Sequence, residues 1–269
     1  MRAAAIQMTS GRDVQQNLAE ARRLIQIAVD QDAQLVVLPE NFSFLGATDA
    51  ERIAAVEPFA RGPAQQFLAE QAQAHQIWLV GGTIPIREAD DRACSRSLLF
   101  APDGRCVAHY DKIHLFDVDV PGRESERYRE SQTTLAGTRV VIAATPLARI
   151  GMTVCYDIRF PALFHRLSVE GMDILVVPAA FTVPTGRVHW QPLLQARAIE
   201  SMVFVVAAGQ WGEHAGGRKT YGHSMVIGPW GDILAVQDEG PGVVCADLDM
   251  IQLKQLRESF PVLQHRREL

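Results

Sequence analysis

The chain has 269 residues, 48% of them hydrophobic, so it is long enough to bury a full core in one large domain or two small ones. Its 26 lysines and arginines against 31 aspartates and glutamates give a formal net charge of −5 at pH 7. This mildly acidic balance, without a basic tract, excludes nucleic acid as an expected partner.

The cysteines and the hydropathy pattern indicate the cellular compartment. Four cysteines lie far apart without a CxxC pair, which argues against a zinc ribbon or a thioredoxin-like redox site. The opening "MRAAAIQMTSGRD" has too few apolar residues for a signal peptide, and no run approaches the roughly 18 that a bilayer span requires. We therefore expect a cytoplasmic protein with free thiols and no membrane association.

Short apolar runs alternate with amphipathic stretches along the whole chain, a pattern typical of α/β proteins. The expected strands cover 3–9, 33–40, 77–83, a hairpin within 97–111, 147–157, 173–181, 203–209, a hairpin within 223–236, and 242–248. The expected helices cover 14–28, 63–75, 161–171 and 188–202, and a last one begins near Asp249. Because hairpins accompany the alternation and no linker or repeat divides the chain, we expect one domain, 1–269, with mixed sheets.

Three polar residues stand where predicted strands end. Glu40 closes "LVVLPE", Lys112 follows "CVAHYD", and Cys155 follows "IGMTV". Functional groups of open α/β sheets collect beyond the carboxyl ends of strands, so a base, a cation and a nucleophile could meet at one edge. The residue types alone also fit a small buried cysteine, a capping glutamate and a surface lysine.

The turn after Cys155 fits acyl transfer. Pro161 starts the next helix, so the turn between strand and helix could expose the sulfur as a nucleophile elbow does. A nearby ammonium or helix N-terminus would favour the thiolate; alternatively, Glu40 could take the thiol proton during attack. Lys112 and the backbone N–H of Tyr156 would then stabilise the developing oxyanion.

Three segments, "LVVLPENF", "YDKIHLFD" and "GMTVCYDIRFP", resemble in content and order the signature segments of the nitrilase superfamily of carbon-nitrogen hydrolases. The resemblance continues to "FPVLQHRREL" and so covers essentially the whole chain. It implies a four-layer α-β-β-α sandwich that pairs into homodimers or higher homo-oligomers, and a Glu-Lys-Cys triad of Glu40, Lys112 and Cys155. It also implies hydrolysis that needs neither metal nor cofactor.

A second acid of the superfamily lies in a short "ES" segment after the lysine motif. It matches Glu130 in "YRESQTTLAG", where it would position Lys112 and the substrate amide. The preceding "GRESERYRES" offers a competing pair, Glu124 and Ser125, and we prefer Glu130.

The segment "PAAFTVPTGRVHW" resembles two branches of the superfamily: the omega-amidases and the deaminated glutathione amidases. The later "AAGQWGEHAGGRKTYGHSM" is more similar to the second branch, whose substrate is an extended anion. The resemblance thus implies an amidase that forms a cysteine thioester and releases ammonia. We expect the loop with His214, Arg218, Lys219 and Tyr221 to meet substrate carboxylates, and Phe181 and Thr182 to line the acyl pocket.

Other functions remain open from the residues. They are an omega-amidase acting on α-ketoglutaramate, another aliphatic amidase or nitrilase, a Cys-His hydrolase pairing Cys155 with His189 or His165, and a non-catalytic binding protein. The eight histidines contain no HExxH pattern, so packing or surface roles fit them best.

Overall fold

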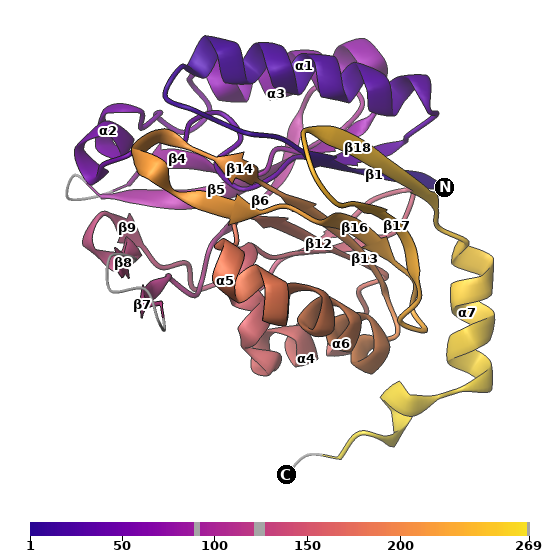
Figure 1. The fold of residues 1–269 in the computed structure, drawn as a ribbon. Helices are drawn as coiled ribbons and strands as arrows, with labels where there is room; N and C mark the ends of the chain where they lie inside the picture. The colour runs from indigo at the N-terminus through magenta and orange to yellow at the C-terminus, as the bar shows by residue number, and fades with distance from the viewer. Residues whose placement is uncertain (89–91, 121–126, 268–269) are drawn as a thin grey trace.

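Two mixed β-sheets stacked on one another form the centre of this computed structural model, which describes residues 1–88, 92–120 and 127–267 (Figure 1). The first sheet has the order β18-β1-β2-β3-β5-β4, with β6 and β9 paired to β5. Its strands are β1 (Arg2–Gln7), β2 (Leu35–Val37), β3 (Trp78–Val80), β4 (Ile84–Arg87), β5 (Ala93–Phe100), β6 (Cys106–Asp111), β9 (Thr134–Leu135) and β18 (Gly242–Asp247).

The second sheet has the order β10-β11-β12-β13-β16-β17 and is parallel only at its centre. Its strands are β10 (Ile142–Ala144), β11 (Arg149–Met152), β12 (Ile174–Ala179), β13 (Phe204–Gly209), β16 (Ser224–Ile227) and β17 (Ile233–Gln237). Parallel β11, β12 and β13 are joined through helices, whereas β16 and β17 form a hairpin, so the expected mixed character is confirmed.

Helices cover the outer face of each sheet. α1 (Val14–Asp30) and α3 (Pro63–His75) lie on the first sheet, and α4 (Pro161–Val169) and α6 (Gln191–Ser201) lie on the second (Figure 1). α7 (Met250–Ser259) lies at the edge, beside β18 and the N-terminus (Figure 1). The predicted four-layer α-β-β-α sandwich is therefore confirmed. No helix among the described residues is long and apolar enough to cross a membrane.

The central strands are buried on both faces, which explains their unbroken apolar runs. In β2, Val37 joins the core between the two sheets, while Val36 joins the core beneath α1 and α3. Successive side chains of a strand point to opposite faces, so a strand between two layers needs apolar residues at every position.

Several elements escaped the sequence pattern. β4 contains Pro85, which a central strand would not tolerate, but β4 is the last strand of the sheet: β5 pairs along one edge, and the other edge forms a single bridge, to Glu57. Other missed elements are short, among them β9, β10, α2 (Asp49–Ala54) and two antiparallel strand pairs: β7 (Asp117–Asp119) with β8 (Arg127–Arg129), and β14 (Trp211–Glu213) with β15 (Lys219–Tyr221). The helix expected over 188–202 is α6 preceded by one turn of π-helix, η3 (Gly186–Trp190), and the three-residue α5 (Val183–Thr185).

Candidate active site

Cys155 sits on a sharp turn at the end of β11. Thr153 Oγ1 donates a hydrogen bond to the Val176 carbonyl of β12 at 2.9 Å, which holds the chain at the strand end. Cys155 then adopts φ +49°, a left-handed conformation that costs a residue with a side chain about 1–2 kcal/mol. The 3₁₀-helix η2 (Cys155–Arg159) follows, and Pro161 begins α4. The sharp turn is predicted as an elbow that could expose the sulfur; in the structure Cys155 is buried, with 7% of the residue exposed.

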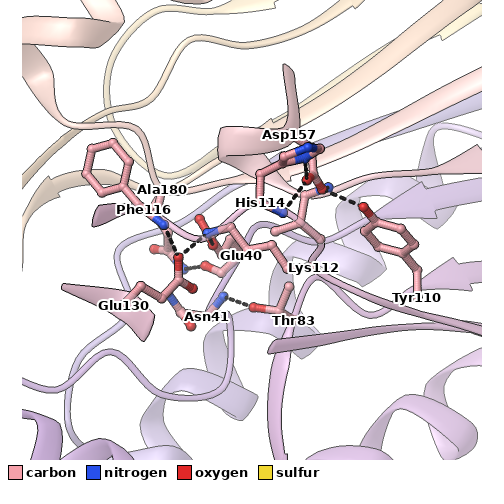
Figure 2. A network of polar contacts seen from close by, with 12 residues as sticks. Glu40, Asn41, Thr83, Tyr110, Lys112, His114, Phe116, Glu130, Asp157 and Ala180 are labelled. Atoms are coloured by element: carbon pink, nitrogen blue, oxygen red, sulfur yellow. Dashed lines mark hydrogen bonds and ion pairs between the residues drawn. The ribbon is translucent and has the colours of Figure 1, made fainter. Parts of the chain in front are cut away.

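Lys112 lies between two carboxylates rather than at the surface. Its Nζ is 2.8 Å from Glu40 Oε1 and 2.8 Å from Glu130 Oε2 (Figure 2). The residue is only 2% exposed. Its backbone is fixed as well, because its N–H donates to the Ser95 carbonyl at 3.0 Å and its carbonyl accepts from Gly137 N at 2.8 Å. The ammonium therefore has little freedom to leave this position.

The turn that carries Glu40 is held by three neighbours that the sequence did not identify. Gln210 Nε2 donates to the Glu40 carbonyl at 3.0 Å, and Asn41 N donates to Thr83 Oγ1 at 2.9 Å. Gly82, with φ +49°, lies so close that an added Cβ would stand 2.0 Å from the Pro39 carbonyl. Only glycine fits there, which lets the turn after β3 press against the Glu40 turn.

Glu130 begins the 3₁₀-helix η1 (Glu130–Gln132) and bridges Lys112 to the next loop. Its Oε2 also accepts a hydrogen bond from Phe116 N at 2.8 Å (Figure 2), and Arg52 Nη2 lies 3.9 Å from its Oε1. The competing pair Glu124 and Ser125 lies outside the described residues.

Burial and charge shift the protonation equilibria of this cluster in opposite directions. Burial opposes the charged form of Lys112, but the charges of Glu130 and Glu40 outweigh it and raise its pKa. Burial also opposes the ionisation of Glu130, yet the charges of Lys112 and Arg52 leave its pKa lowered. Burial raises the pKa of the Cys155 thiol well above its usual value; the Glu40 charge adds to this, and Lys112 opposes it. The resting cluster is thus an ionised Glu130–Lys112 pair beside a neutral thiol.

A cavity of about 940 Å³ opens onto this cluster. Glu40, Lys112, Glu130 and Cys155 all line it, and so do four further predicted residues: Tyr156, Phe181, Thr182 and Arg218. Tyr221 does not line it, because its ring stacks on His223 at 3.9 Å between centroids and packs over Gly186. The structure thus brings together every predicted site residue except Tyr221 and His214, neither of which lines the cavity.

Cations outnumber acids in the cavity wall. Besides Lys112, the lining cations are Arg52, Arg127, Arg129, Arg187, Arg218 and Lys219, against Glu40, Asp49 and Glu130. Sequence reasoning gave none of Arg52, Arg127, Arg129 and Arg187 a role. Arg52 lies on α2, outside every motif, whereas the other three stand within the quoted segments "GRESERYRES" and "PAAFTVPTGRVHW". In a chain of net charge −5, this concentration of positive charge attracts anions to the cavity.

The histidines proposed for an alternative dyad do not reach Cys155. His165 is exposed on α4, and His189 is an exposed residue whose Nδ1 lies 3.2 Å from Arg159 Nη1. Neither lines the cavity. No group of three or more His, Cys, Asp or Glu residues in the described part of the chain is arranged to hold a metal ion.

His214 has a structural position beside the cavity. Its Nδ1 lies 2.8 Å from the Ser10 carbonyl and its Nε2 lies 2.6 Å from Thr220 Oγ1. Both ring nitrogens are thus engaged within the protein, and burial lowers the pKa of His214 to about 4.

We expect His214 to reduce stability in mild acid. Unfolded histidine has a pKa of about 6.5, so between pH 6.5 and 4 the unfolded chain binds a proton that the folded one excludes, and the free energy of unfolding falls by up to about 3 kcal/mol. Urea unfolding at pH 7.0 and 4.5 would measure this loss, which should be smaller in His214→Gln. Equal losses in the two proteins would contradict the assignment.

Comparison with known proteins agrees with this arrangement. The model of the family described as carbon-nitrogen hydrolase matches residues 2–258. A deaminated glutathione amidase from Synechocystis sp. is 45% identical over 268 residues, covering 98% of this chain and 97% of that protein.

Solved structures are also similar. The crystal structure of the Caenorhabditis elegans NitFhit protein has a TM-score of 0.90 at 38% identity and covers 99% of this chain and 65% of that one. A Glu-to-Gln mutant of the amidase from Nesterenkonia sp. AN1, with the acetamide moiety of fluoroacetamide added at its active-site cysteine, has a TM-score of 0.80 at 26% identity and covers 99% and 94% of the two chains.

Proposed function

This chain belongs to the carbon-nitrogen hydrolase family, and from that premise we propose that it hydrolyses the amide of deaminated glutathione through a thioester on Cys155. The observation that carries the proposal is the buried Glu40–Lys112–Cys155 cluster at the base of a cationic cavity. A relative with that name is 45% identical over nearly the full length. Deaminated glutathione is anionic, so its charge is opposite to that of the cationic cavity lining.

The proposed reaction begins with attack of Cys155 Sγ on the amide carbon while Glu40 takes the thiol proton. Lys112 Nζ and the N–H of Tyr156 stabilise the oxyanion; Tyr156 lies in the first turn of η2, where amides have no acceptor within the helix. Glu40 then returns the proton to the departing amine. A water that loses its proton to Glu40 attacks the thioester carbon, the bond from that carbon to Cys155 Sγ breaks, and Glu40 returns the proton to the sulfur, which releases the acid and restores the thiol.

The direction of the Cys155 pKa favours Glu40 as the base over a preformed thiolate. Burial and the Glu40 carboxylate both stabilise the neutral thiol, and Lys112 offsets this only in part. Since Glu40 approaches both Lys112 and the thiol, it can accept the proton at the moment of attack. Lys112 stays charged throughout, because its pKa is raised.

The covalent structure of deaminated glutathione corrects the leaving group expected from the sequence. Its amide nitrogen belongs to a cysteinyl-glycine unit, so hydrolysis releases this dipeptide and α-ketoglutarate. Ammonia would leave only from a primary amide such as α-ketoglutaramate. The two candidate reactions therefore share the acid product and differ in the amine.

Arg218 is the cation best placed to bind a substrate carboxylate near Cys155. Its Nη2 donates to the Ala180 carbonyl at 3.0 Å, and the backbone of Ala180 also approaches the Cys155 sulfur. Its guanidinium carbon lies 5.3 Å from the centroid of the Tyr128 ring, and its Nε is buried without a hydrogen-bond partner among the described residues. A donor left unsatisfied at a cavity wall costs free energy until a ligand pairs with it.

We expect Arg218→Ala to raise KM for deaminated glutathione by about 10- to 100-fold, the loss of one charged hydrogen bond, while kcat changes less. Lys219→Ala is the matched control, because Lys219 also lines the cavity but is exposed and pairs with Glu213 at 3.1 Å. Steady-state kinetics would measure both variants. An unchanged KM in Arg218→Ala removes this residue from the binding site.

The test of the proposed function measures α-ketoglutarate formation from deaminated glutathione and from α-ketoglutaramate under the same conditions. A higher kcat/KM for deaminated glutathione, lost in Cys155→Ala, supports the proposal. A higher value for α-ketoglutaramate would move the enzyme to the omega-amidase reaction and leave the chemistry at Cys155 intact. Turnover of neither would refute the proposed substrate.

The proposal includes a homodimer or a higher homo-oligomer in the cytoplasm. An exposed apolar group supports association: the ring of Trp230 lies 5.4 Å from that of Phe260, and Ile199 packs beside Gly231. All four cysteines are free, as is usual in a reducing compartment. Light scattering at assay concentration would measure the oligomeric state, and a monomer would contradict this part.

A further inference from the structure

The two groups that meet the substrate carbonyl come from different sheets. Lys112 stands on the loop after β6 in the first sheet, and Cys155 stands on the turn after β11 in the second. An error of about 1 Å between such groups can cost roughly 100-fold in rate. Something in the structure must therefore hold the two loops in register.

One buried carboxylate contacts both loops. Asp157, two residues after Cys155, is 0% exposed. Its Oδ1 accepts a hydrogen bond from His114 N at 3.0 Å and lies 2.8 Å from His114 Nδ1 (Figure 2). Its Oδ2 accepts from Tyr110 Oη at 2.8 Å and from Val154 N at 2.9 Å.

These four donors flank the two reactive residues. Tyr110 and His114 stand two positions before and after Lys112, and Val154 immediately precedes Cys155. The His114 ring also stacks on Phe160 of the Cys155 segment, with 3.6 Å between centroids and 4° between planes. The carboxylate thus connects the Lys112 loop to the turn that gives Cys155 its left-handed conformation.

We propose that Asp157 is a positioning residue, which sets the distance between the Cys155 sulfur and the Lys112 ammonium without touching the substrate. This inference rests on the proposed role of Cys155 and Lys112. The positioning role requires a side chain whose two oxygens only accept hydrogen bonds, since each oxygen faces two donors.

An asparagine cannot replace this carboxylate. Whichever way its amide is turned, the NH₂ group faces a backbone N–H, that of His114 on one side or that of Val154 on the other. The Tyr110 hydroxyl can rotate to become an acceptor, but a backbone amide cannot. Asp157→Asn therefore loosens one of the two loops at its backbone.

Tyr110→Phe supplies the matched control. Tyr110 lies within β6, where it pairs with Ser97 of β5, so the strand holds its position without Asp157. His114 lies beyond the strand end, where Asp157 supplies two contacts. We expect the control to lose one hydrogen bond of about 1 kcal/mol and to keep kcat within about threefold.

The experiment combines turnover with active-site counting. Asp157→Asn should lower kcat about 100-fold with KM within about threefold, while iodoacetamide still labels Cys155 to one site per chain, at a rate lowered about tenfold. Because labelling needs no amide substrate, this arm stays valid even if deaminated glutathione is not turned over. Mass spectrometry would identify the labelled cysteine.

Two results would overturn the inference. One is a fall in kcat matched by an equal fall in labelled sites, which would mean that Asp157 only maintains folding. The other is unchanged turnover and labelling in a folded Asp157→Asn protein. If this variant does not fold, His114→Ala is the substitute test, because it removes the side-chain contact with Asp157 and the stacking on Phe160 but keeps the backbone hydrogen bond. We then expect kcat to fall about tenfold while iodoacetamide still labels one Cys155 per chain. An unchanged kcat refutes the proposal.

Discussion

Replacing Cys155 with alanine is expected to lower kcat/KM by at least about 10⁴-fold, since removing a nucleophile leaves only binding and oxyanion stabilisation. The fold should persist, because the change removes a single sulfur at the border between the core and the cavity. Circular dichroism would verify folding, and α-ketoglutarate formation would give the rate.

Cys94→Ala is the control for this variant. Cys94 is also a buried free thiol, but it lies on β5 outside the cavity, and burial raises its pKa to about 11. We expect this variant to keep its activity within about threefold and to lose at most about 1 kcal/mol of stability. Retained turnover in Cys155→Ala, or an equal loss in both variants, would refute Cys155 as the nucleophile.

Lys112→Met is expected to lower the activity about 10³-fold or more, because a donor to the oxyanion is lost along with the charge that holds Glu40 in place. Stability should fall as well, by about 3–5 kcal/mol near neutral pH, since the buried carboxylates of Glu40 and Glu130 lose their shared cation. Methionine nearly matches lysine in length and packs well, so the loss reports charge rather than volume.

The stability loss in Lys112→Met should depend on pH in a defined direction. Burial opposes the ionisation of Glu130, and without the opposing ammonium its pKa should rise above the roughly 4.3 of an unfolded glutamate. The folded variant then binds more protons than the unfolded chain, so its stability is lost as pH rises through the raised pKa. Urea unfolding at pH 5 and pH 8 would measure a larger difference from the wild type at pH 8.

Lys219→Met is the control for charge removal, since Lys219 is exposed and an exposed ion pair contributes at most about 1 kcal/mol. A loss of stability in Lys112→Met that is the same at pH 5 and pH 8 would contradict the proposed coupling. Activity above about one tenth of the wild type would exclude Lys112 from the oxyanion site.

In the cavity, the charged groups proposed for catalysis and the cations available for substrate binding occupy different places. The groups proposed to act on the carbonyl are buried beside Cys155, whereas Arg187 and Lys219 are exposed side chains of the cavity wall. Arg187 projects from the π-helical turn η3 and forms no ion pair with any described residue. Such turns are frequent at functional sites, and this one adds an exposed cation to the cavity wall.

Much of the architecture could be predicted from local sequence because periodicity reports which faces are buried. The helix over 63–75 agrees with the structure to the residue, and the apolar run of β2 indicated a strand covered on both sides. The ends of β2, β6 and β11 also located Glu40, Lys112 and Cys155. Glu130 was identified by resemblance alone, since nothing in its own surroundings distinguishes it from Glu124.

The order of the residues was enough to predict which of them stand at strand ends and which chemistry their types allow, because strand and helix periods depend on neighbours along the chain. Three features became visible only in the folded protein: Lys112 is buried between two carboxylates, the Cys155 thiol stays neutral, and Asp157 contacts a loop more than 40 residues away. Tertiary structure also excluded Tyr221 from the cavity and added Arg52 and Arg187. The physical reason is that distances, burial and electric fields depend on pairing between distant segments, which no local pattern encodes.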